Sequence, residues 1–128
     1  MTLITISNWP ASLNDPERRP NLNDTWQFVV REDMRRHVLD ARLPGIIRKE
    51  MVHVVFGPSQ TEPGADKTVV ATVEISPHES PNDPLKAAAR LASFLGNAMK
   101  DRLDEGWRAE IFIHLHHNGT VYSGFWAG

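Results

Sequence analysis

The sequence predicts an α+β domain: a four-stranded mixed sheet with two helices on one face, followed by a short C-terminal strand. Three observations support this prediction. Short apolar or alternating segments are typical of strands, two longer segments have apolar residues at helical spacing, and these segments follow one another as strand–helix–strand twice over. The 128 residues are the usual size of one domain, so we expect a single domain over residues 1–128.

The first half opens with a strand over Leu3–Trp9, where apolar residues alternate with polar ones. Pro10 ends this strand, because proline cannot donate a hydrogen bond to a neighbouring strand. The segment Ala11–Asn23 is rich in Pro, Asn and Asp and is expected to be a surface loop.

A helix follows the loop, with Asp24 or Thr25 as its cap and Pro44-Gly45 as its end. Its apolar stripe has mostly four-residue spacing and consists of Trp26, Val30, Met34, Val38 and Leu39. A short strand over Trp26–Val30 is the alternative. Met51–Phe56, apolar and β-branched, completes this half as a buried strand.

The second half repeats the order, with a strand over Thr68–Ile75 after a loop over Gly57–Lys67. Asp83-Pro84 is a strong helix start, a capping carboxylate followed by proline, and Glu105-Gly106 ends the helix. Its expected buried stripe is Leu85, Ala88, Ala89, Leu91, Ala92, Leu95, Ala98, Met99 and Leu103. A strand over Arg108–His116, a type I′ turn at Asn118-Gly119 and a short strand over Thr120–Phe125 close the chain.

The composition excludes several classes of function. The chain has no cysteine, which rules out thiol catalysis, disulfides and thiolate metal sites and fits a reducing compartment. The net charge of −2 and the lack of a basic stripe argue against a nucleic-acid partner. No apolar window approaches a membrane span and the N-terminus lacks a basic leader, so we expect a soluble, cytoplasmic protein.

Several segments resemble the tautomerase superfamily, and in particular macrophage migration inhibitory factor and its relatives. Met1–Pro10 resembles their opening strand, Met51–Val55 their second strand, Leu91–Leu103 their second helix, and Trp107–Gly128 their closing strands. Ala11–Asn23 resembles an insertion. The order of elements alone is shared with the ferredoxin-like fold. The resemblance implies a tautomerase-like fold, no cofactor and a homotrimer that buries the second face of the sheet. We also expect that two helices cannot cover all of the apolar strand residues, which include Ile4, Ile6, Val69, Val73, Ile111 and Ile113.

The resemblance also implies keto–enol chemistry on a small 2-oxo or enol acid, for which the family uses an N-terminal proline as general base. Here residue 2 is Thr2, so this chemistry is expected to be weak or absent. In the alignment that matches Trp9-Pro10 to the family's strand end, Met1 occupies the proline position. The pKa of an α-amine ordinarily lies not far above neutral pH, so Met1 is the candidate base.

Candidate substrate-binding residues lie on the fourth strand and before the second. Arg108 could hold a substrate carboxylate through a bidentate fork, and it shares a strand face with Glu110, Phe112 and His114. Arg48 and Lys49 precede the second strand, where the family often carries a basic residue. The alternative for all of these is an ordinary charged surface.

Two histidines, His114 and His116, share a strand face, and His117 follows them. Imidazole pairs can hold zinc or copper, but the one carboxylate at a suitable spacing is Glu110, so no metal ligands are assigned. Three functions remain open: a tautomerase-like protein with an altered site, a non-catalytic binding or scaffolding protein of the same fold, and a histidine metal-binding protein.

Overall fold

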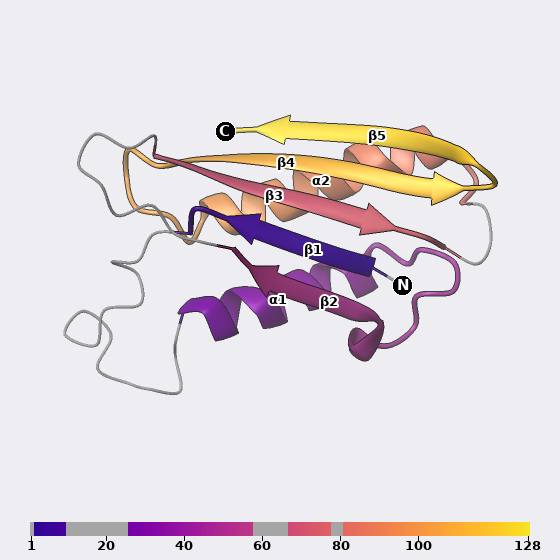
Figure 1. The fold of residues 1–128 in the computed structure, drawn as a ribbon, viewed down its shortest axis with the longest axis horizontal. Coiled ribbons are helices and arrows are strands. Elements are labelled where there is room, and N and C mark those ends of the chain that lie inside the picture. The colour runs from indigo at the N-terminus through magenta and orange to yellow at the C-terminus, as the bar shows by residue number, and fades with distance from the viewer. Residues whose placement is uncertain (1, 10–25, 58–66, 78–80) are drawn as a thin grey trace.

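The computed structural model describes residues 2–9, 26–57, 67–77 and 81–128 (Figure 1). The loop expected over Ala11–Asn23, the two candidate caps before the first helix, and Met1 lie outside the described residues. The elements are β1 (Thr2–Ser7), α1 (Trp26–Asp40), a 3₁₀ turn (Lys49–Met51), β2 (Val52–Phe56), β3 (Thr68–Ile75), α2 (Pro84–Lys100), β4 (Arg108–His117) and β5 (Thr120–Ala127).

The strands form one sheet in the order β2-β1-β3-β4-β5. β1 runs parallel to β2 and β3 runs parallel to β4, so each predicted strand–helix–strand half is confirmed as a parallel pair. The halves join through the antiparallel pair β1 and β3. The sheet has five strands rather than four and a short tail strand, because β5 pairs with β4 from Thr120 to Ala127.

Both helices lie on the same face of the sheet (Figure 1), and the hydrophobic core lies between the helices and the sheet. Buried α1 residues are Val30, Met34 and Val38, as the predicted stripe requires. A single chain therefore buries the inward residues of the sheet, and Ile4, Ile6, Val69, Val73, Ile111 and Ile113 are each 0% exposed. The expectation that two helices could not cover these six was wrong, because they all point toward the helices rather than away from them.

Several element ends differ from the sequence prediction, and two of the differences have a clear local cause. β1 ends at Ser7 rather than Trp9, because Asn8 takes a left-handed φ of 65°, which asparagine tolerates and a strand does not. The regular part of α2 ends at Lys100 rather than Glu105. The amides of Arg102 and Leu103 donate to carbonyls three residues earlier, so the chain tightens into 3₁₀-type turns there.

The start of α2 confirms the predicted cap but corrects part of the buried stripe. Asp83 Oδ1 accepts the Lys86 amide at 3.1 Å, and Pro84 occupies the first turn. Leu85 and Ala89 are exposed, whereas Ala87 is buried. Leu85 lies in a turn that borders a cleft rather than the sheet, and Ala89 points about 100° away from Ala88.

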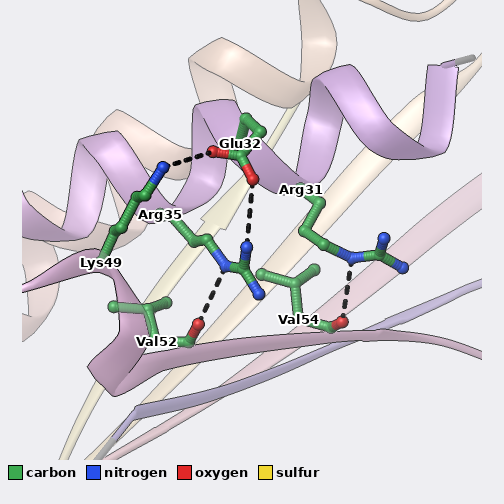
Figure 2. A network of polar contacts seen from close by, with 6 residues as sticks. All are labelled: Arg31, Glu32, Arg35, Lys49, Val52 and Val54. Atoms are coloured by element: carbon green, nitrogen blue, oxygen red, sulfur yellow. Dashed lines mark hydrogen bonds and ion pairs between the residues drawn. The ribbon is translucent and has the colours of Figure 1, made fainter. Parts of the chain in front are cut away.

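The outer edge of β2 is covered by arginines of α1 (Figure 2). Arg35 Nε donates to the Val52 carbonyl at 3.0 Å, and Arg31 Nε donates to the Val54 carbonyl at 3.4 Å. Glu32 on α1 holds Arg35 at 3.0 Å and lies 3.8 Å from Lys49 Nζ. A strand that added to this edge would have to displace these side chains.

Neither helix in the described part of the chain is long and apolar enough to cross a bilayer.

Candidate functional site

The polar cluster of the open sheet face, the face without helices, is built on one carboxylate. Glu74 on β3 pairs in register with His114 on β4. His114 Nδ1 lies 2.8 Å from Glu74 Oε1, and His116 Nε2 contacts Glu74 Oε2. All three side chains are partly exposed: 42% for Glu74, 38% for His114 and 46% for His116. The cluster is therefore open to a ligand from solvent.

The two imidazoles change the protonation of the carboxylate. Hydrogen bonds from His114 and then His116 lower the pKa of Glu74 below its ordinary value of 4.5, while partial burial acts in the opposite direction. An ionised carboxylate accepts hydrogen bonds and cannot donate them, so the ring nitrogens that face Glu74 carry hydrogens. The opposite nitrogen of each neutral ring then presents a lone pair, which makes both rings potential proton acceptors.

The cluster belongs to a cross-strand row near one end of the sheet. Register pairs join His53 to Leu3, Leu3 to Glu74, Glu74 to His114 and His114 to Ser123. Paired residues share a face, so these five side chains lie side by side on the open face. This is the end at which β1 begins and β3 and β4 finish (Figure 1).

Arg108 and Met1 were predicted to share one site, but the structure places Arg108 far from both His114 and the start of β1. Arg108, Glu110, Phe112 and His114 do share the open face. However, Arg108 pairs with Thr68 at the far end of β4, six residues and roughly 20 Å from His114. Met1 lies outside the described residues, but its neighbour Thr2 is buried on the helix-facing side and pairs with Ile75, at the His114 end. Within one chain, Arg108 and Thr2 therefore lie at opposite ends of the sheet.

The remaining candidate residues have the following positions. Phe112 packs against Phe125 of β5, with 5.1 Å between ring centroids. Glu110 pairs in register with Ala127, also away from the cluster. Arg48 is exposed at the start of the 3₁₀ turn before β2, and Lys49 lies beside Glu32. Neither of these two basic residues contacts Glu74.

Glu74 was not predicted as a site residue, and Glu110 was considered as the carboxylate beside the histidines. The register between β3 and β4, which the sequence does not reveal, brings Glu74 to His114. No group of three or more histidine, aspartate or glutamate side chains in the described ranges is arranged to hold a metal ion. The metal-binding alternative therefore gains no support from the cluster.

Glu74→Gln should flatten the dependence of stability on acidic pH. The folded-state pKa of Glu74 is lowered, so its contribution to the free energy of unfolding is present above the unfolded pKa and is lost as pH falls through the folded pKa. Urea unfolding between about pH 5 and about pH 3 should show a steeper loss for the wild type than for Glu74→Gln. The difference should be small because the exposed cluster is screened by solvent. If the free energy of unfolding fell equally with pH in the wild type and in Glu74→Gln, ionised Glu74 would not stabilise the folded state.

Comparison with known proteins supports the fold. No family model matches the chain, and no curated protein matches its sequence. The chain is similar to a crystal structure of N1, a member of the cis-3-chloroacrylic acid dehalogenase (cis-CaaD) family, with a TM-score of 0.55. The match covers 95% of this chain and 84% of that chain at 13% sequence identity. The two chains therefore share an α+β fold, which is the fold class predicted from the sequence.

Proposed function

We propose that the chain is a tautomerase-like protein that binds a small 2-oxo acid or its enol at the His114 end of the open sheet face and transfers its proton slowly. One observation carries this proposal: an ionised carboxylate orients two imidazoles beside the strand that begins the chain. Thr2, where the resemblance would place a proline, is the reason that we propose slow turnover.

The proposed reaction is a proton shift that needs no other reactant. A ring nitrogen of His114 that does not face Glu74 accepts the hydroxyl proton of the enol, and the resulting imidazolium returns a proton to the neighbouring carbon as the carbonyl forms. Glu74 holds the ring in the tautomer that this step requires and stabilises the imidazolium. The α-amine of Met1, the neighbour of Thr2 in the sequence, is the second group that could carry a proton.

The substrate carboxylate needs a cation, and two arginines are candidates for it. Arg48 precedes β2, whose first residue pairs with Thr2, so it lies toward the same end of the sheet as His114. Arg108 lies about 20 Å from His114 along its own strand, so it would serve a cluster on another copy of the chain. Arg48→Gln and Arg108→Gln, made separately, distinguish these sources. The variant that has lost the cation for the substrate carboxylate should have the higher KM.

Phenylenolpyruvate should be ketonised at a rate about 100-fold or more below that of a proline-bearing tautomerase, because one well-matched general base is absent. The loss of ultraviolet absorbance follows the reaction. His114→Gln should remove most of the remaining rate, whereas His117→Gln, which changes a ring that contacts Asn118 rather than Glu74, should not.

Two outcomes would contradict this proposal. A rate equal to that of the proline-bearing enzyme, abolished by blocking the α-amine, would show that the chemistry is intact and amine-driven. Absence of both binding and turnover would favour the non-catalytic scaffolding alternative.

We also propose that the protein is a homotrimer, as the resemblance implies. Its open face carries exposed apolar side chains on three of its strands, namely Leu3 on β1, Val55 on β2, and Val121 and Phe125 on β5. The β2 edge is covered by Arg31 and Arg35, whereas β5 ends the strand order among the described strands. The open face and the β5 edge are therefore the surfaces that assembly would use.

A further inference from the structure

A cleft in the helix layer lies between the turn after α1 and the first turns of α2. Its volume is about 510 Å³, and it is lined by residues 41–44 on one side and by residues 81–83, Lys86, Ala87 and Arg90 on the other. This volume is within the range of small-molecule sites. The cleft is separate from the Glu74 cluster, which lies on the opposite face of the sheet.

Three basic side chains line this cleft: Arg42, Lys86 and Arg90. Within the described part of the chain, none of the three forms an ion pair with a carboxylate. Among the described lining residues Asp83 is the one acidic residue, and its carboxylate caps α2 by accepting the Lys86 amide. In this described part of the lining, three cations against one carboxylate leave two positive charges in excess.

The positive charges at this cleft destabilise α2 when no anion is bound. Lys86 and Arg90 are four residues apart on α2, where like charges repel, and Lys86 lies in the first turn, near the positive end of the helix dipole. Arg90 is nevertheless held at the cleft, because its Nη2 donates to the Ala41 carbonyl at 3.3 Å. A bound anion would relieve the repulsion among these side chains.

We propose that this cleft binds the phosphoryl group of a small phosphate monoester. A phosphoryl dianion matches the two excess positive charges, the guanidinium groups of Arg42 and Arg90 are suited to paired hydrogen bonds with its oxygens, and Lys86 supplies a third cation. The backbone at the start of α2 is not the binding group. The Lys86 and Ala87 amides are already bonded to Asp83.

Isothermal titration of the full chain with glycerol 3-phosphate at low ionic strength tests this site. We expect saturable binding that weakens with added salt and is tighter than binding of succinate. Lys86→Gln and Arg90→Gln should each raise the Kd by about tenfold or more. Arg48→Gln, which changes an exposed arginine outside the cleft, should leave the Kd unchanged, and so should His114→Gln.

Lys86→Gln is the decisive variant, because the Lys86 side chain makes no bond in the described structure, whereas Arg90 also supports the turn after α1. Equal binding by the wild type and Lys86→Gln would overturn the site, as would the absence of saturable binding at low salt. Tighter binding of succinate than of the phosphate ester would overturn the assignment of a phosphoryl group. An unchanged Kd in His114→Gln would separate this site from the proposed proton-transfer function.

Discussion

Gly124→Ala is expected to lower the free energy of unfolding by about 3 kcal/mol, because α2 and β5 meet at this glycine with no room for a side chain. A Cβ at residue 124 would lie 2.4 Å from the Ala88 carbonyl oxygen and 2.5 Å from its carbon. Both atoms belong to the helix backbone, so no side chain can rotate away. The helix would have to move off the sheet, and the packing of both would loosen.

Urea unfolding followed by circular dichroism measures this change as a lower midpoint with an unchanged slope. Ser123→Ala is the matched control, since residue 123 lies on the same strand but points to the open face. Gly96→Ala should also be destabilising. Its Cβ would overlap the indole of Trp126 close to where the ring joins its Cβ, so the whole side chain would have to move. A Gly124→Ala protein as stable as the wild type would show that the helix can shift freely over β5.

The elements could be predicted from the sequence wherever the signal is local. Asp83-Pro84 marks the start of α2, and strict alternation marks β3 and β4, so these elements are found where they were expected. The β1 end could not be predicted in this way, because it depends on the backbone conformation of Asn8. The exposure of Leu85 depends on how far the sheet extends beneath the first turn of α2, which periodicity does not reveal.

The polar sites depend on contacts between distant segments, and here the sequence was less informative. The open face of β4 was correctly assigned, but the partner of His114 comes from β3, 40 residues earlier. The arginines of α1 look like an ordinary solvated helix face in the sequence. Only the fold shows that Arg31 and Arg35 cover the carbonyls of an edge strand.

Size exclusion coupled to light scattering should give a mass of about 43 kDa at low micromolar protein, three times the 14.4 kDa of one chain, if the proposed closed trimer forms. The driving force is burial of exposed apolar side chains on the open face, where Phe125 is 58% exposed. The buried inward face of the sheet contributes nothing, because the two helices already cover it within each chain.

Phe125→Lys should shift the mass toward 14.4 kDa, since the charge would be buried at the proposed interface. Leu85→Lys is the matched control: it introduces the same charge at a leucine that is 59% exposed on the helix side, and it should leave the trimer intact. Deleting residues 120–128 is a poorer test. β5 pairs with β4 along its whole length and Trp126 packs against Gly96 of α2, so the deletion would unfold the subunit itself. A wild-type mass of 14.4 kDa would exclude the trimer, and an effect of Leu85→Lys equal to that of Phe125→Lys would move the interface to the helix layer.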